Sequence, residues 1–248
     1  MKLESRKKGV PAAKEWIDDE TDFREHGIAA GSELARENRD NGYLQGAGQG
    51  RVALRKLNLE GDRQADLTVH GGEHKAVYCY PLAHYGYWKK ELPGRELPIG
   101  MFGENFTIDD GAPGLLGGQK LLEESVHLGD RFSIGTADVV VTQPRLPCYK
   151  LGVRFGSDDM VKRFLASGRT GFYVAVLREG EVGAGDEIEV ISGEANAVAV
   201  SEITHLYVVK RYGEAEIRAV RRALQVEELP ESWKEYFRER LRQAGETN

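Results

Sequence analysis

The stretch "DVVVTQPRLPCYKLG", residues 138–152, joins a run typical of a buried β-strand to a segment stiffened by two prolines. The three consecutive valines favour a strand, and the prolines fix two φ angles and remove two backbone donors. Cys148 follows at once, between Arg145 and Lys150. Because cations beside a thiol favour its thiolate form, the stretch predicts a strand that leads to a reactive or metal-binding cysteine.

Short strands of the same kind recur from position 51 onward, separated by glycine-containing turns. Runs rich in Val, Ile, Phe and Tyr predict the strands: "RVALRKLNL", "KAVYCY", "FGENFTI", "RFSIG", "DVVVTQ", "GFYVAVLREG" and "DEIEVIS". Two of them follow a Gly-Asp turn, in "HLGDRFSI" and "GAGDEIEV", which suggests a closed or nearly closed barrel. The expected fold class is α+β, a β-barrel of short strands with a few helices, followed by a small three-helix domain.

Helical spacing of apolar residues appears between the strands and again after them. Short helices are expected over 81–92, where a proline opens the first turn, and over 158–166. After position 192, apolar residues spaced by three and four predict three helices, with Ser201 as the cap of the first. The expected organisation is an atypical, tail-like segment at 1–50, a barrel domain at 51–192 and a three-helix domain at 195–245.

Composition restricts the classes of function. The 40% hydrophobic and 30% charged fractions are those of a soluble globular protein, and a net charge of −6 argues against a general nucleic-acid or membrane-surface binder. No apolar run approaches the roughly 20 residues that span a bilayer, and the first residues lack the apolar region of a secretory signal. We therefore expect a cytoplasmic protein that binds neither nucleic acid nor membrane.

The motif "VHGGEHKAVYCYP", residues 69–81, admits two chemical interpretations. His70 and a second histidine flank a glutamate as in the H-x-x-E-H motif of inverted zinc peptidases. That motif requires a helix that presents both imidazoles on one face, whereas Gly71 and Gly72 precede a β-type run here. A glycine pair beside Lys75 better suits the approach of backbone amides to an anion, and a tight turn with a surface histidine remains the simpler alternative.

Two further turns carry candidate anion contacts. In "SGRTGFY", Arg169 offers a fork of donors, Thr170 a hydroxyl and Gly171 an unobstructed backbone amide, which together suit a phosphate group. In "GEN", Glu104 precedes Asn105, whose amide can both donate and accept at the edge of a heterocycle. Taken singly, each is better explained as a turn or a solvated surface charge than as an anion contact.

The two cysteines have different surroundings. Cys79 lies within "AVYCY" and is expected to be an inert core residue. Cys148 is expected to act as a metal ligand, which needs only one cysteine, or as a nucleophile, which needs a general-base histidine oriented by a third group. The G-x-G-x-G at 46–50 follows no apolar strand and has no Rossmann spacing, so a dinucleotide loop is not expected there.

Together these motifs resemble the MOSC domain, the module named for the C-terminal part of molybdenum-cofactor sulfurases. The resemblance is carried by HGG, GEN and PRxPC in this order, and by "LGDRFSIG" and "SGRTGFYVAVLREGEVGAGDEI". The nearest subgroup is the YiiM-like proteins, which also carry a C-terminal three-helix extension. The match covers roughly residues 51–191 in the domain and 195–245 in the extension.

The resemblance implies a β-barrel that binds the molybdenum cofactor (molybdopterin), with Cys148 as molybdenum ligand and catalytic residue or as a carrier of sulfur. The implied function is reduction of N-hydroxylated compounds, such as nucleobases, with electrons from a reductase protein. The alternative is a non-catalytic cofactor or sulfur carrier that serves apo-molybdoenzymes. Pyridoxal phosphate is suggested only because some sulfurases join a MOSC domain to a pyridoxal-phosphate domain, and no such domain fits in this chain. The implied cofactor contacts are His70, Gly71, Gly72, Lys75, Glu104, Asn105, Arg145, Lys150, Arg169, Thr170 and Gly171.

The chain departs from this subgroup just before the first predicted strand. Subgroup members begin with a short strand and a Lys-x-Pro-Val-like run, where this chain has "NGYLQGAGQGRVAL". The first barrel strand, with any cofactor contacts on it, is therefore expected to be missing or replaced.

Overall fold

The structure is a computed structural model that describes residues 51–60, 72–109, 121–193 and 198–246. The expectations for residues 1–50, and for His70 and Gly71, lie outside these residues. The strands are β1 (Val52–Leu54), β2 (Val77–Pro81), β3 (Phe106–Ile108), β4 (Arg131–Ile134), β5 (Ala137–Pro144), β6 (Phe172–Arg178), β7 (Gly180–Val182) and β8 (Ile188–Ser192). The helices are the 3-10 turn η1 (Glu73–Lys75), α4 (Ala83–Glu91), α5 (Tyr149–Phe155), α6 (Met160–Ala166), α7 (Val200–Val208), α8 (Glu214–Ala223) and α9 (Glu231–Gln243).

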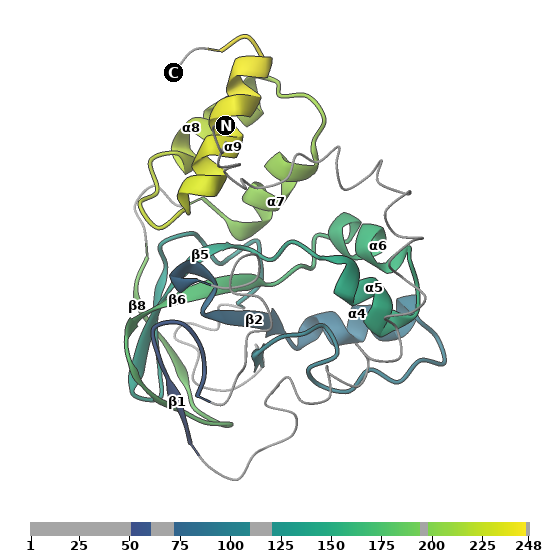
Figure 1. Cartoon of the computed structure of the whole chain (residues 1–248), viewed down its shortest axis with the longest axis vertical. Coiled ribbons are helices and arrows are strands. Elements are labelled where there is room, and N and C mark those ends of the chain that lie inside the picture. The colour runs from purple at the N-terminus through teal and green to yellow at the C-terminus, as the bar shows by residue number, and fades with distance from the viewer. Residues whose placement is uncertain (1–50, 61–71, 110–120, 194–197, 247–248) are drawn as a thin grey trace, which may run out of the picture.

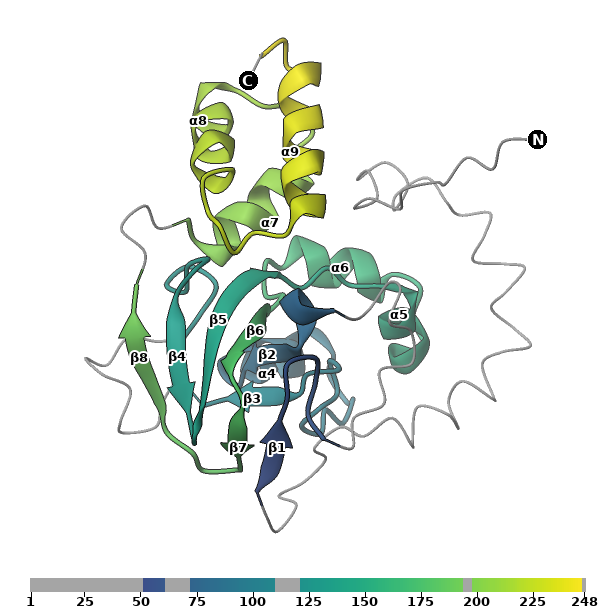
Figure 2. The ribbon, with the colours of Figure 1, turned by 60° about the vertical axis from the view of Figure 1, so that its left-hand side comes forward.

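The strands form a curled mixed sheet rather than a flat one. Its order is β3-β2-β6-β5-β4-β8, and β1 pairs with β7 beside it. Neighbours run antiparallel except β2 and β3, which are parallel. Figure 2 shows β8, β4, β5 and β6 side by side in the curve, with β1 and β7 at one end. The expected α+β class is confirmed, as a half-barrel with helices.

Strand β2 separates two apolar cores. Side chains alternate across a strand, so Val77 and Cys79 join the main core while Tyr78 and Tyr80 join an aromatic cluster on the opposite face. Helices α4, α5 and α6 cover that second face, which explains why every position of β2 is buried. Cys79 is 1% exposed, and burial raises the pKa of its thiol far above the usual value. Its predicted place in the core is confirmed.

The first predicted strand, "RVALRKLNL", is wrong in its length. Strand β1 ends at Leu54, and the chain then turns back on itself, with the Glu60 amide donating to the Ala53 carbonyl at 2.8 Å. Leu54 and Leu59 pair across this turn, and both are buried. The apolar residues that suggested one long strand thus come from the two arms of a tight turn.

Two helix starts differ from prediction, and one helix was not predicted. Pro81 is the last residue of β2 rather than the first turn of α4, and α7 begins after Ala199, so Ser201 lies inside its first turn. Helix α5 follows a proline-rich stretch and contains Gly152, both of which disfavour a helix. It forms because Leu151 and Phe155 are buried in the aromatic cluster.

Helices α7, α8 and α9 pack on the end of the sheet, as Figure 1 shows. Their apolar residues belong to the same core cluster as the barrel valines. The Leu128 amide donates to the Val198 carbonyl at 3.0 Å, and the Val200 amide donates to the Val126 carbonyl at 2.9 Å. None of the helices in the described part of the chain is long and apolar enough to cross a membrane.

Candidate functional site

Cys148 lies at the junction between the sheet and α5. Strand β5 ends at Pro144, and the Arg145 amide then donates to the Gly171 carbonyl at 3.2 Å, which holds the proline segment against the start of β6. Cys148 has an extended backbone, with φ −121° and ψ 172°, and its side chain is half-buried. The predicted strand leading to a partly accessible cysteine is therefore present.

The turn η1 brings Lys75 to this cysteine. The half-buried Lys75 interacts electrostatically with Cys148; burial lowers the pKa of the Lys75 ammonium, and a charge on Cys148 opposes that shift. The turn starts at Gly72, whose φ of +103° suits glycine, and the Lys75 amide donates to the Gly72 carbonyl at 2.9 Å. Two motifs that are distant in the sequence thus supply a thiol and a cation to one place.

Arg145 lies beneath this junction with its charge against aromatic rings. Its guanidinium carbon is 5.1 Å from the centre of the Tyr78 ring and 5.2 Å from that of Phe164. Burial raises the pKa of Tyr78 well above its usual value, and the Arg145 charge opposes that rise. Arg145 is 8% exposed, whereas Lys150, on the first turn of α5, is half-buried.

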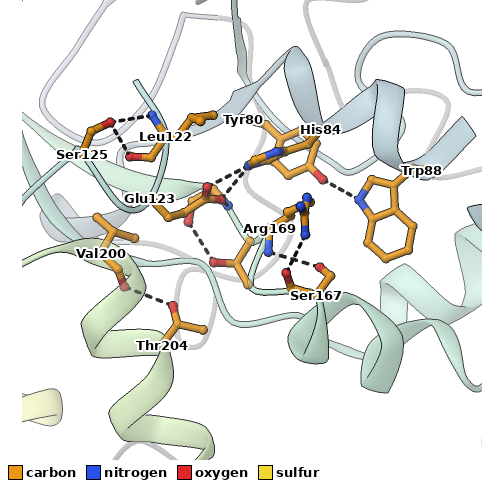
Figure 3. Close-up of polar contacts among 12 residues, drawn as sticks. Tyr80, His84, Trp88, Leu122, Glu123, Ser125, Ser167, Arg169, Val200 and Thr204 are labelled. Atoms are coloured by element: carbon orange, nitrogen blue, oxygen red, sulfur yellow. Dashed lines mark hydrogen bonds and ion pairs between the residues drawn. The ribbon is translucent and has the colours of Figure 1, made fainter. Parts of the chain in front are cut away.

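The expected phosphate contacts of Thr170 and Gly171 are not supported, because both groups have partners inside the protein. The Thr170 side chain is fully buried, and its hydroxyl donates to the Gly171 carbonyl at 3.2 Å. The Gly171 amide donates to a Glu123 carboxylate oxygen at 2.6 Å. Arg169 has its guanidinium carbon 4.0 Å from the centre of the Tyr87 ring, and its Nη1 donates to the Ser167 carbonyl at 3.0 Å (Figure 3).

The two residues of the "GEN" turn also have structural partners. Glu104 is 2% exposed, and its carboxylate accepts hydrogen bonds from the Tyr85 hydroxyl, the Thr107 hydroxyl and the amides of Gly100 and Phe102. A direct cofactor contact by Glu104 is therefore not supported, since its oxygens hold the 100–107 turn. The side-chain oxygen of Asn105, Oδ1, accepts a hydrogen bond from the Tyr78 amide at 2.8 Å, beside the pairing of β2 with β3.

Sequence reasoning missed a buried polar pair next to these turns. His84 Nε2 lies 2.8 and 3.0 Å from the two carboxylate oxygens of Glu123, and Figure 3 shows the imidazole pointing at the carboxylate. The two residues are only 5% and 1% exposed. Because Glu123 also holds the Gly171 amide, the pair fixes the segment that carries Arg169. His84 lies in the short helix α4 and Glu123 in a short polar run, so neither shows a local signal.

The described residues do not form the helix that a zinc-peptidase motif requires. Glu73 to Lys75 form a single 3-10 turn, and β2 begins two residues later at Val77. Within the ranges that the structure describes, no group of three His, Cys, Asp or Glu side chains is placed to hold a metal ion.

The groups around Cys148 fit a ligand that brings its own metal and carries negative charge. One half-buried thiol can supply a single soft metal ligand. Lys75 interacts with it electrostatically, and Arg145 and Lys150 flank it along the chain. Positive groups around a thiol stabilise both the thiolate and a nearby anion.

Comparison with known proteins gives the family. Residues 66–189 match the MOSC domain, and residues 198–244 match the YiiM-like 3-alpha helix domain. The chain is 38% identical over 199 residues to the uncharacterized protein YflK of Bacillus subtilis, covering 80% of this chain and 83% of that one. It is 32% identical over 146 residues to a protein named reductase from Gibberella moniliformis, covering 57% of this chain but 24% of that one.

A solved structure shows the same arrangement. The crystal structure of YiiM from Geobacillus stearothermophilus superposes with a TM-score of 0.64 at 33% identity, covering 77% of this chain and 85% of that one. The curled sheet and the three C-terminal helices agree with these matches. The chain belongs to the MOSC family, in its YiiM-like subgroup with C-terminal helices.

Proposed function

We propose that this protein binds the molybdenum cofactor and reduces N-hydroxylated compounds with electrons from a separate reductase protein. The observation that carries the proposal is the half-buried Cys148 at the end of the sheet, within the electrostatic influence of the half-buried Lys75. A thiol that faces a cation can serve as a thiolate ligand for a soft metal. The reductase named among the relatives favours a redox reaction over simple carriage.

The residues around Cys148 have separate tasks in this proposal. Cys148 provides the thiolate that holds the metal, and Lys75 balances its negative charge. Lys150 and Arg169 are proposed to contact the anionic end of the cofactor, with the backbone at Gly72 and the Asn105 amide as further contacts. Because Arg145 is buried, we assign it a supporting role rather than a direct contact with the cofactor. It supports the proline segment before Cys148 through its contacts with Tyr78 and Phe164. His70 and Gly71 remain predicted contacts outside the described residues.

The cofactor supplies the two-electron redox chemistry when it is bound. The overall reaction takes two electrons and two protons, breaks one N–O bond, and yields the amine and water. The protein holds the reacting group in a partly buried position next to fixed charges, where electrostatic interactions are stronger than in water. The electrons come from the partner protein.

The test uses protein purified from a host that makes the cofactor. We expect molybdenum by elemental analysis, pterin fluorescence, and donor-dependent conversion of an N-hydroxylated purine to its amine. Cys148→Ser should lose molybdenum and turnover, because a hydroxyl is a hard ligand that ionises poorly. Equal molybdenum content and equal turnover in the wild type and Cys148→Ser would overturn the ligand assignment.

Cys79→Ser is the matched control. It places a hydroxyl in the main core, so we expect a loss of about 1–3 kcal/mol in the free energy of unfolding but unchanged molybdenum content. A protein that retains cofactor, shows no donor-dependent turnover and restores activity to an apo-molybdoenzyme on mixing would be a carrier instead.

A further inference from the structure

We infer that Gln143 is a positioning residue of this site, held by Trp233 of α9, and that the C-terminal helices thereby set the place of Lys75 against Cys148. Gln143 lies on β5 with its side chain 4% exposed. Trp233 Nε1 donates to its Oε1 at 2.8 Å, and its Nε2 donates to the His74 carbonyl at 3.2 Å. The inference rests on the proposed function only in taking Lys75 and Cys148 as the binding site.

The chemistry of the indole fixes the orientation of the Gln143 amide. An indole N–H can only donate, so the amide oxygen must face Trp233 and the amide NH₂ group must face the other way. That group then meets the His74 carbonyl, which can only accept. Without the indole donor, the Gln143 amide would no longer be held in one orientation, and its hydrogen bond to the His74 carbonyl would weaken.

A bulge in β5 lets a second side chain reach the same carbonyl. The pairing of β5 with β6 shifts register between Val141 and Gln143, and such a bulge re-aims side chains that would otherwise alternate across the strand. The Thr142 hydroxyl donates to the His74 carbonyl at 2.7 Å. The turn η1 is thus held to β5 at one carbonyl, one residue before Lys75.

The other end of the connection is rigid. Trp233 is 1% exposed, and its ring packs against Tyr207, Tyr236 and Phe237 at centroid distances of 5.6, 6.2 and 5.6 Å. Gln143 lies near the end of β5, and Cys148 follows shortly after that strand, so one continuous stretch of chain carries both the cysteine and the residue that anchors the turn with Lys75. The C-terminal helices thus connect to the site through the hydrogen bonds from Trp233 to Gln143 and from Gln143 to His74.

The first experiment measures the turn itself in cofactor-free protein. The Lys75 amide, bonded to the Gly72 carbonyl, reports on η1 by hydrogen exchange followed by NMR. Trp233→Phe keeps an aromatic ring in the core but removes the donor, and Gln143→Met removes the amide from the β5 side. We expect Lys75 exchange to become about fivefold faster in each variant, as for the loss of one ordinary hydrogen bond.

Tyr236→Phe is the control, because it removes a hydroxyl from the same helix without touching Gln143. It should leave Lys75 exchange unchanged. Unchanged Lys75 exchange in both Gln143→Met and Trp233→Phe, with melting temperatures near that of the wild type, would overturn the inference. Equal acceleration in Tyr236→Phe would overturn it too, since general loosening of α9 would then be the cause.

The second experiment asks whether Gln143 acts through Lys75. In protein loaded with molybdenum cofactor, Lys75→Met and Gln143→Met should each lower the molybdenum retained after dialysis, and the double variant should lose no more than Lys75→Met alone. If the double variant instead retained less molybdenum than Lys75→Met, by the product of the two single effects, the positioning role would be contradicted. If the wild type retains no molybdenum, the proposed function fails, while the exchange experiment still decides the inference.

Discussion

At the scale of single residues, Gly171 shows how tightly the site is built. Its φ is +66°, and a Cβ added there would lie 2.4 Å from the Cys79 carbonyl oxygen. Its amide donates to Glu123, and its carbonyl accepts the Arg145 amide. One glycine therefore joins the buried His84–Glu123 pair, the core strand β2 and the segment that carries Cys148.

We predict that Gly171→Ala lowers the free energy of unfolding by more than about 3 kcal/mol. The new methyl group must displace neighbouring backbone atoms, and the alanine must also adopt a positive φ. Gly156→Ala is the matched control: its φ is +54°, but a Cβ there meets nothing within 4 Å. It should cost about 1–2 kcal/mol. Urea unfolding of the two variants checks this, and equal losses would show that the close approach is unimportant.

At the scale of elements, the outer face of β2 and helix α4 form a cluster of buried tyrosines. Burial raises the pKa of Tyr78, Tyr80 and Tyr85 well above the usual value for a phenol. Each hydroxyl has a partner: Tyr78 donates to the Thr170 carbonyl, Tyr80 accepts from Trp88 Nε1, and Tyr85 donates to Glu104. The cluster stabilises the fold only while these phenols stay protonated.

We predict that the protein loses stability steeply above about pH 10, the pKa of a tyrosine in an unfolded chain. Because the folded-state pKa values are raised, the stabilisation is complete below that pH and falls as the unfolded chain ionises. Above that pH, each such tyrosine lowers the free energy of unfolding by about 1.4 kcal/mol per pH unit. Urea unfolding between pH 9 and about 11 measures the slope.

Tyr78→Phe provides the check on that slope. It removes one titrating group from the cluster, so the fall in unfolding free energy per pH unit should be smaller than in the wild type by about 1.4 kcal/mol. An identical slope in the variant would mean that Tyr78 ionises equally in the folded and unfolded chains, against the burial argument.

At the scale of the whole molecule, the sheet and the C-terminal helices share one core. Val126 and Leu128 on the barrel side, and Ile203 and Phe237 on the helical side, belong to the same buried cluster. Backbone hydrogen bonds also join the two parts at the start of α7. Helices this short are marginal alone, and here the barrel supplies the surface that they bury.

We predict that a chain ending at residue 193 does not fold to a soluble barrel, because deletion exposes the apolar surface beneath α7 and α9.

Removal of residues 1–40 should be tolerated, since their sequence lacks a convincing apolar period. Thermal melting of both truncated proteins tests this. A fall of tens of degrees after the N-terminal deletion would show that this segment is structural.

The sequence by itself determined the features that depend on local pattern. Alternating and β-branched residues predicted the strands β2 to β6 and β8 but not the short β7, and the three- and four-residue spacings predicted α8 and α9. The order of the HGG, GEN and PRxPC motifs indicated the family that the comparisons then showed. The proline context set Cys148 apart from the core residue Cys79, because Pro144, Pro147 and the neighbouring cations can be recognised in the sequence without knowledge of any contact.

Only the tertiary structure decided which of these residues meet. It brought Lys75 into electrostatic interaction with Cys148, paired the Gly171 amide with the Glu123 carboxylate instead of a bound ligand, and buried the Glu104 carboxylate in a turn. It also formed α5 against its local propensity and linked Trp233 to Gln143. The physical reason is common to all: long-range packing determines which groups meet and form hydrogen bonds, and no local period in a single sequence records such partners.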